Sequence, residues 1–317
     1  MKKLELSKQD FEGRFFGKLS CSEFRREFFR KAHLLVRGSS EDFYSCVFSK
    51  GDLSKLLSER MLHRPSIRMA REDGVLAMSE ISTSIPYGVF SFENVVDIEK
   101  VQHWYERGYT INVRGAHYNH SGLAAASKIM QELFDCNVRT NLYLTPSGQR
   151  GLTPHYDVHD VIVVQISGTK VWSLFENNFE NPTENFRFGR RPFDVGKVID
   201  EFELSPGDLL YLPRGFSHAA TSNIESLHVT IGIEEPTAAD LLRAVADLLE
   251  TEVDLRESIE FNRMATDADY RDALVKQLAS CFAERTKGSR LFDAVGLAKK
   301  RNFDRAIERN VSFLNGL

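Results

Sequence analysis

Cysteine is scarce and unpaired in this sequence. Only Cys21, Cys46, Cys136 and Cys281 occur among 317 residues, and no two of them form a CxxC pair. Their scatter argues against a disulfide framework and against a zinc site built from thiolates. Long apolar runs are also lacking, since no stretch approaches the roughly 18 continuous apolar residues that a membrane span requires. We therefore expect free thiols and no membrane segment.

Excess charge of either sign is lacking as well. The formal net charge is −4 and the sequence pI is about 6.2, so nothing global favours direct binding to nucleic acid or to a membrane surface. The chain begins with Met and two lysines, but Glu5, Lys8 and Asp10 interrupt any apolar core of the kind a secretion signal needs. We expect a cytoplasmic protein.

Short strand-like segments dominate residues 101–235. Strand patterns are found at 110–113, 141–144, 161–166, 170–175, 201–204, 209–212 and 227–233, with turn-forming residues at 146–148, 167–168 and 206–207. Many short strands at such spacing predict a barrel or a sandwich. We expect a mainly β fold with flanking helices, whose core at 101–235 is a double-stranded β-helix of the cupin type.

Helical patterns flank this core. Residues 1–100 contain helices and strands that we expect to pack on the barrel, and 122–134 has helical spacing. Residues 236–317 form a third, helical region, in which Thr237 and Asp240 resemble a capping box. Its apolar stripes fit packing on the barrel and a homodimer contact equally well. These stripes contain Leu241, Val245, Leu248 and Leu249, followed by Leu274, Leu278 and Phe282.

Two separated motifs together suggest a metal centre. His155 and Asp157 stand two residues apart, so in an extended chain both side chains project from one face. That triplet alone is weak evidence, but a turn, an apolar strand and a second turn at 206–217 lead to His218. Two imidazoles and one carboxylate leave coordination positions open, as Fe(II) needs when it binds O2 and a cosubstrate together. Zinc would favour a closed, tetrahedral site.

Other histidines have weaker cases. His159 could compete as a ligand, although it cannot easily join His155 and Asp157 on one ion. His228 alternates with apolar neighbours and fits either the lining of a pocket or a satisfied core position. The remaining histidines have no partner pattern and are interpreted as structural. They are His33, His63, His103, His117 and His120.

The chain resembles the ribosomal-oxygenase branch of the JmjC proteins over roughly residues 10 to 250. The resemblance lies in NLYLTP at 141–146, TPHYDVHDV at 153–161, Gln165, and GTKVW at 168–172. Those enzymes are 2-oxoglutarate-dependent hydroxylases of ribosomal-protein side chains. The resemblance implies metal ligation by His155, Asp157 and His218.

The resemblance also assigns residues to the cosubstrate. Lys170 would bind the distal carboxylate of 2-oxoglutarate, and Asn141 and Tyr143 would line its pocket. Ser222 and His228 occupy family-like positions near that pocket. The expected reaction consumes 2-oxoglutarate and O2 at Fe(II), releases succinate and CO2, and hydroxylates an unactivated C–H bond.

The region after Pro236 departs from the family pattern. Fewer than 90 residues follow Pro236, so we expect no complete winged-helix domain of the kind that ribosomal oxygenases have, although dimerising helices fit. Because substrate identity follows loops and added domains more than the iron site, the substrate is left open. We favour a protein or peptide side chain such as His or Arg over a free amino acid or peptide natural product, and both over demethylation of lysine. A non-catalytic metal-binding cupin and a cupin enzyme without 2-oxoglutarate are the alternatives.

Overall fold

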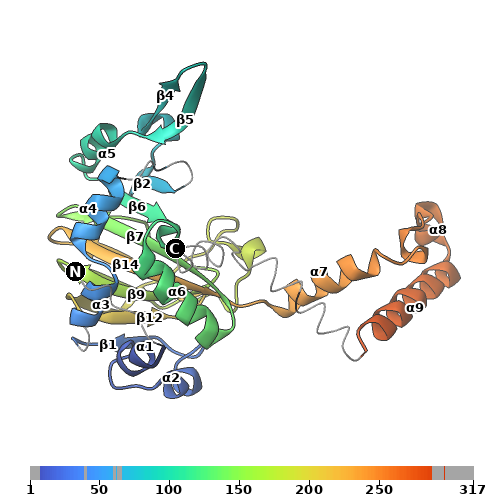
Figure 1. Ribbon diagram of the computed structural model, residues 1–317. Helices are drawn as coiled ribbons and strands as arrows, with labels where there is room; N and C mark the ends of the chain where they lie inside the picture. Colours follow the sequence, from blue (N-terminus) through green and yellow to red (C-terminus); the bar gives the residue numbers. More distant parts are fainter. Residues whose placement is uncertain (1–7, 39–40, 60–61, 63–65, 288–295, 297–317) are drawn as a thin grey trace. The chain divides into compact units, whose positions relative to one another are not determined.

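The chain forms two compact units. The computed structural model describes residues 8–38, 41–59, 62, 66–287 and 296 (Figure 1). The first unit contains the residues through Glu234 and the second begins at Glu235.

An antiparallel sheet of eight strands forms the base of the first unit. Its order is β1-β12-β9-β14-β7-β6-β2-β3, and all neighbouring strands are antiparallel. The strands are β1 (Leu34–Val36), β2 (Ile67–Arg71), β3 (Gly74–Val75), β6 (Thr110–Arg114), β7 (Asn137–Thr145), β9 (Asp160–Ser167), β12 (Leu209–Leu212) and β14 (Ser226–Glu234).

A smaller sheet faces this base. Its order is β11-β10-β13-β8, with β11 at Val198–Leu204, β10 at Lys170–Phe175, β13 at His218–Ser222 and β8 at Gln149–Arg150. Trp172 and Leu174 of β10 pack with Val161 and Val163 of β9 in a buried apolar cluster. Two antiparallel sheets closed over such a core form the double-stranded β-helix that the sequence predicts.

Helices cover the outer face of the large sheet, where a second and larger apolar core lies (Figure 1). Its aromatic residues include Phe24 and Phe134, whose rings meet edge to face at 6.0 Å. Near-zero exposure of these rings shows that the N-terminal helices complete the core. The helices of this unit are α1 (Lys8–Arg14), α2 (Cys21–Glu27), α3 (Glu41–Val47), α4 (Lys50–Glu59), α5 (Ile98–Tyr105) and α6 (Ser121–Phe134).

Strand alternation separates an apolar outer face from a partly polar inner face. On β14, Val229 and Ile231 belong to the outer core, while His228 and Thr230, which alternate with them, face the smaller sheet. The same alternation applies to β6 and β7. Polar side chains are thereby gathered between the two sheets, which is where the candidate site lies.

Shorter elements complete the first unit. A separate hairpin consists of β4 (Ser82–Tyr87) and β5 (Phe90–Val96). Three short 3-10 turns are present in addition, at Met78–Glu80, Ala116–Tyr118 and Glu184–Phe186.

The second unit is helical. It contains α7 (Ala238–Leu249), a 3-10 turn at Asp254–Arg256, α8 (Phe261–Thr266) and α9 (Ala268–Arg285). The capping box predicted at Thr237 and Asp240 is present, with both reciprocal hydrogen bonds. No helix among the described residues is both long enough and apolar enough to cross a membrane.

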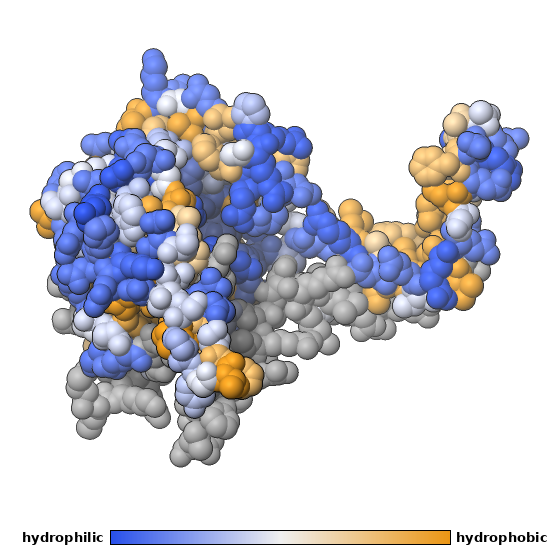
Figure 2. Space-filling view, turned by 90° about the horizontal axis from the view of Figure 1, so that it is seen from above, coloured by the Kyte–Doolittle hydropathy of each residue, from blue (hydrophilic) through white to orange (hydrophobic). Residues whose placement is uncertain are grey.

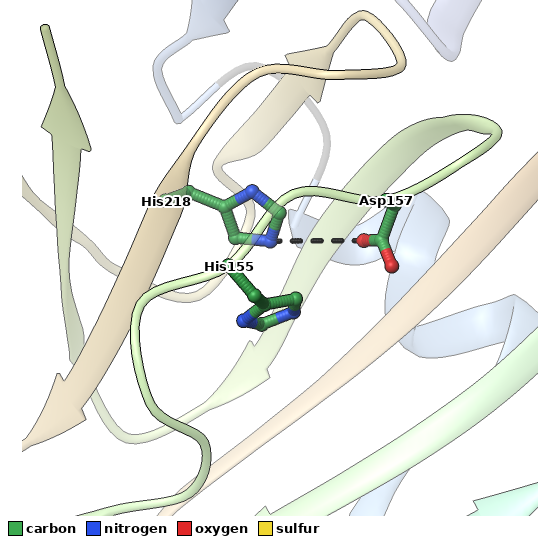
Figure 3. A group of neighbouring side chains, drawn as sticks. All are labelled: His155, Asp157 and His218. Atoms are coloured by element: carbon green, nitrogen blue, oxygen red, sulfur yellow. Dashed lines mark ion pairs between the residues drawn. The ribbon is translucent and has the colours of Figure 1, made fainter. Parts of the chain in front are cut away.

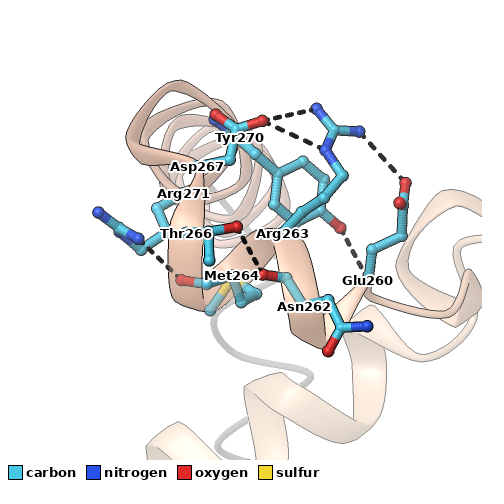
Figure 4. A network of polar contacts seen from close by, with 8 residues as sticks. All are labelled: Glu260, Asn262, Arg263, Met264, Thr266, Asp267, Tyr270 and Arg271. Atoms are coloured by element: carbon cyan, nitrogen blue, oxygen red, sulfur yellow. Dashed lines mark hydrogen bonds and ion pairs between the residues drawn. The ribbon is translucent and has the colours of Figure 1, made fainter.

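A polar network joins α8 to α9 (Figure 4). The Arg263 guanidinium contacts Glu260 at 3.2 Å and Asp267 at 3.1 Å, and it lies 4.4 Å from the centre of the Tyr270 ring. Arg271 donates to the carbonyl of Met264 at 2.9 Å. The network fixes the sharp turn between these helices.

Most predicted elements are observed, and the predicted fold class is confirmed. Strands 170–175 and 209–212 have the predicted limits, and the helix predicted at 122–134 is α6. The N-terminal segment was predicted to pack on the barrel. In the structure it also adds strands to the large sheet, because β1 and β2 are hydrogen-bonded members of it. Strands β8 and β13 were not predicted.

Candidate metal centre and cosubstrate pocket

His155, Asp157 and His218 converge on one point (Figure 3). One ligand atom from each lies within 4.8 Å of the others, and His218 Nε2 is 3.7 Å from Asp157 Oδ2. Two backbone hydrogen bonds between His155 and His218, at 3.0 and 2.8 Å, hold the loop against β13. The carbonyl of Asp157 accepts a third from the amide of Gly215 at 2.8 Å. The backbone thus places all three predicted ligands.

Hydrogen bonds fix the tautomers of both imidazoles. His155 Nδ1 is 2.8 Å from the carbonyl of Thr153, and His218 Nδ1 is 2.8 Å from the carbonyl of Phe216. A carbonyl only accepts, so Nδ1 carries the proton in each ring and Nε2 presents a lone pair. This is the arrangement by which proteins orient histidine for metal binding.

The charge state also suits a cation. Burial, together with the nearby His155, lowers the pKa of His218 to about 4, so its ring is neutral at pH 7. For Asp157, burial alone would raise the pKa, but the positive charges of the protonated imidazoles, His159 first, and of Arg187 outweigh burial and lower the pKa. Neutral imidazoles and an ionised carboxylate are the forms that bind a metal ion.

Tyr156, between the two ligands of the loop, anchors that loop. Its ring is buried and lies 5.1 to 5.3 Å from the rings of Phe179, Phe188 and Phe193. Its hydroxyl donates to the carbonyl of Phe186 at 2.8 Å. All four phenylalanines belong to the connection between β10 and β11, which therefore braces the ligands. Sequence reasoning missed this role, although the clustered phenylalanines at 179–193 were a visible signal.

Lys170 is the buried cation between the sheets. It is 3% exposed, and its ammonium donates to Thr145 Oγ1 at 2.9 Å. Burial lowers the pKa of Lys170 to about 7. No ion pair with Lys170 exists among the described residues, so an anion is needed to stabilise its charged form.

Polar atoms without partners surround this lysine. His228 is buried beside Lys170, and both burial and that neighbour hold its pKa well below the ordinary value. The ring of His228 stacks on Tyr143 at 4.9 Å and meets Trp172 edge to face at 5.7 Å. His228 Nδ1, Trp172 Nε1 and Ser222 Oγ are buried and have no hydrogen-bond partner among the residues that the structure describes. Buried polar atoms normally have a hydrogen-bond partner, so these three can bind ordered water or a polar ligand.

Asn141 and Tyr143 occupy the inner face of β7. The Asn141 side-chain oxygen accepts from the amide of Gly115 at 3.1 Å, which secures the turn after β6. Tyr143 is hydrogen-bonded to Asn112, and burial together with Asp157 raises its pKa to about 12. Tyr143 thus lies between the candidate metal ligands and the Lys170 pocket, whereas Asn141 supports the neighbouring turn.

Comparisons with known proteins identify the domain that contains the candidate metal ligands. Residues 117–241 match the model of the JmjC domain. The chain carries a JmjC domain. It is 29% identical over 255 residues to the bifunctional lysine-specific demethylase and histidyl-hydroxylase NO66 of Aedes aegypti, covering 76% of this chain and 38% of that protein. Human ribosomal oxygenase 1 is 27% identical over 250 residues, which cover 76% of this chain and 37% of the human protein. The chain thus spans about two fifths of these relatives.

A solved structure shares the fold. The ribosomal oxygenase YcfD of Escherichia coli, in complex with cobalt and 2-oxoglutarate, superposes with a TM-score of 0.56 at 20% identity, covering 86% of this chain and 68% of YcfD. The likeness confirms the JmjC fold of the present chain.

The other histidines lie outside the cluster of ligands in the JmjC domain. The His159 ring fits against Gly232, where an added Cβ would come within 3.1 Å of His159 Cε1. Its Nδ1 is 3.2 Å from the carbonyl of Asp160. His117 is hydrogen-bonded to Thr140 at 2.9 Å, which fits its expected structural role. His63 lies outside the described residues.

Proposed function

We propose that this JmjC protein is an Fe(II)- and 2-oxoglutarate-dependent oxygenase that hydroxylates an unactivated C–H bond. The observation that carries the proposal is a pair of features between the same two sheets. His155, Asp157 and His218 form an open metal-ligating face, and the buried Lys170 of β10 has no carboxylate partner among the described residues. A dianionic cosubstrate that chelates the metal at one end and binds a cation at the other fits both.

The donor set suits ferrous iron. Two neutral imidazoles and one carboxylate on one side of an ion leave the other positions for cosubstrate and O2. When bound, iron and 2-oxoglutarate together would supply the oxidising power for C–H hydroxylation, with succinate and CO2 as by-products. The chain itself supplies ligand geometry, a counter-charge and a dry pocket.

Each pocket residue has a defined task in this proposal. Lys170 neutralises the distal carboxylate and donates to it, in surroundings where burial strengthens the contact. Trp172 and Tyr143 wall the space between Lys170 and the ligands, and the unpartnered Trp172 Nε1 offers a further donor. Ser222 and His228 extend the polar lining. The Asn141 side chain acts through the Gly115 turn.

A protein or peptide side chain is the favoured substrate. The names of the relatives, a histidyl-hydroxylase and a ribosomal oxygenase, support this class, and His or Arg are the residues we would test first. A free amino acid or peptide natural product is the second candidate. Demethylation of lysine, also part of the NO66 name, ranks below hydroxylation.

We also propose that α7 and α9 form a homodimer contact. Val275, Leu278 and Phe282 of α9 are 62%, 46% and 38% exposed, and hydrophobic areas lie along the C-terminal unit on the face drawn in Figure 2. Such exposed apolar residues are typical of an interaction surface. A cytoplasmic location stays a prediction from the sequence.

The experiment is succinate formation by iron-loaded protein given 2-oxoglutarate and O2, with and without peptides that contain His or Arg. We expect iron-dependent succinate release that particular peptides stimulate. A protein that binds the metal but neither binds nor consumes 2-oxoglutarate would instead be a non-catalytic cupin or one that acts without this cosubstrate.

A further inference from the structure

A polar row on the inner face of the large sheet continues beyond the cosubstrate pocket. Strand pairing places Tyr143 of β7 between His228 of β14 and Asn112 of β6. Asn112 is paired in turn with Arg68 of β2. Because paired residues of antiparallel strands project from the same face, Arg68 stands in one row with Tyr143, on the side away from His228.

The orientation of Arg68 follows from its neighbours. Ile67 and Met69 are buried in the outer core, so Arg68 between them projects from the inner face. On β6 the same reasoning applies to Arg114, which follows Val113 of the outer core. Arg114 stands diagonally across from Arg68, roughly 7 Å away at the Cβ atoms. Two guanidinium groups therefore share this end of the inner face.

Electrostatics agrees with this placement. Burial and the Asp157 carboxylate raise the pKa of Tyr143, whereas Arg68 and Arg114 act on it in the opposite direction. Tyr143 thus has the carboxylate ligand near it as well as the two arginines. Arg68 is two strands from Tyr143, roughly 10 Å between backbones. The space above the tyrosine lies within reach of both.

Arg68 lacks a polar partner in the part of the chain that the structure describes. It is half-buried, and among the described residues it makes neither a hydrogen bond nor an ion pair. Lys170, on the other side of Tyr143, is already suited to the distal carboxylate of the cosubstrate. A guanidinium presents paired donors that match a carboxylate in plane. The Arg68 guanidinium is therefore available to a second anion.

We propose that Arg68, with Arg114 beside it, binds a carboxylate of the primary substrate and so places the attacked C–H bond over Tyr143 near the metal ligands. This inference rests on the oxygenase function proposed above. The carboxylate belongs either to an Asp or Glu next to the oxidised residue or to a free C-terminus, including that of a single amino acid. The substrate class is thus a peptide or amino acid that carries a negative charge close to its reactive carbon.

The test uses three sets of acetylated short peptides with a central His or Arg. The first carries a flanking Asp and an amidated C-terminus, the second replaces Asp by Asn, and the third has Asn and a free C-terminus. Succinate release by the iron-loaded protein gives kcat and KM for each. We expect KM on the order of tenfold lower for the first or third set than for the second, and whichever set is preferred identifies the source of the carboxylate.

Two variants test whether Arg68 is the source of the preference for carboxylate peptides. Arg68→Met should remove the difference in KM between the peptides that carry a carboxylate and the set that has Asn and an amidated C-terminus. Arg71→Met is the matched control, because Arg71 lies on the same strand but on the outer face, paired with Asp73, and it should retain the preference. Equal KM values for all sets in the wild type, or an unchanged preference in Arg68→Met, would overturn the proposal.

A binding assay separates this proposal from the proposed function. Absence of succinate from the wild type under all conditions would contradict the oxygenase function. The same peptides can then be titrated calorimetrically into protein loaded with Co(II) and 2-oxoglutarate. A preference for carboxylate peptides that Arg68→Met abolishes would support the site, and the lack of such a preference would refute it.

Discussion

Replacing Lys170 by Met should abolish tight binding of 2-oxoglutarate while preserving the fold. The lysine is 3% exposed and has Thr145 as its hydrogen-bond partner, at 2.9 Å. Removing one partner of a buried charge pair costs about 3 kcal/mol or more, which corresponds to an affinity loss of roughly 150-fold. Lys128→Met, at an exposed position on α6, is the control and should bind normally.

The pH dependence of this binding follows from the same burial. Without an anion the pKa of Lys170 is about 7, and a bound carboxylate favours the charged form and raises that pKa. Binding should therefore take up a proton above pH 7 and none well below it. We expect the affinity for 2-oxoglutarate to fall roughly tenfold between about pH 6 and about pH 8.

The folding stability of the cosubstrate-free protein should rise with pH, whereas the affinity for 2-oxoglutarate falls. The folded pKa of Lys170 lies below its unfolded value, so the folded state binds fewer protons and stability rises as pH increases from about 7 towards 10. Lys170→Met should remove this rise and stabilise the cosubstrate-free protein most below pH 7. Chemical unfolding at several pH values measures the free energy of unfolding of both proteins.

The assay for binding is calorimetric titration of 2-oxoglutarate into Co(II)-loaded protein, repeated in buffers with different ionisation enthalpies. These give the affinity and the number of protons taken up. Wild-type affinity that is independent of pH, or a Lys170→Met variant that binds like the wild type, would refute the role assigned to this lysine.

Further substitutions probe the metal ligands, the loop that holds them and a glycine turn. His155→Ala and Asp157→Ala should each abolish succinate release and lower metal affinity in equilibrium dialysis, and retained turnover in either would show that the ligands are assigned wrongly. Tyr156→Ala should weaken metal binding on the order of tenfold by loosening the loop, whereas Tyr156→Phe should bind nearly normally in the same dialysis. Gly168→Ala should destabilise the protein by about 2 kcal/mol or more in chemical unfolding, because its φ is +63° and an added Cβ would lie 1.8 Å from the Glu225 carbonyl; wild-type stability would contradict this reasoning.

Local patterns predicted much of the fold. The alternation of Val171 and Trp172 marked β10, and an apolar run between two turns marked β12. Strand β13 was missed because Ala219, Ala220 and Thr221 lack apolar alternation. The long-range pairing of β1 and β2 with the large sheet could not be read either, since register depends on tertiary contacts rather than on local propensity.

The candidate site also contains residues that the sequence could predict and residues that it could not. The ligand triad could be predicted because its spacing has a direct chemical meaning, and Lys170 because of the resemblance to ribosomal oxygenases. The bracing of Tyr156 by distant phenylalanines and the inner-face position of Arg68 depend on how separate segments pack. Nothing in the local sequence of either residue reveals those contacts.

The most direct test of the central claim is isotopic. Iron-loaded protein would be incubated with 2-oxoglutarate under ¹⁸O₂, and the succinate would be analysed by mass spectrometry, with His155→Ala as the control. A 2-oxoglutarate-dependent oxygenase inserts one atom of O2 into succinate and the other into the hydroxylated product. We therefore predict succinate with one ¹⁸O atom from the wild type and none from the variant. No succinate, or only unlabelled succinate, from wild-type protein that has bound iron would contradict the account.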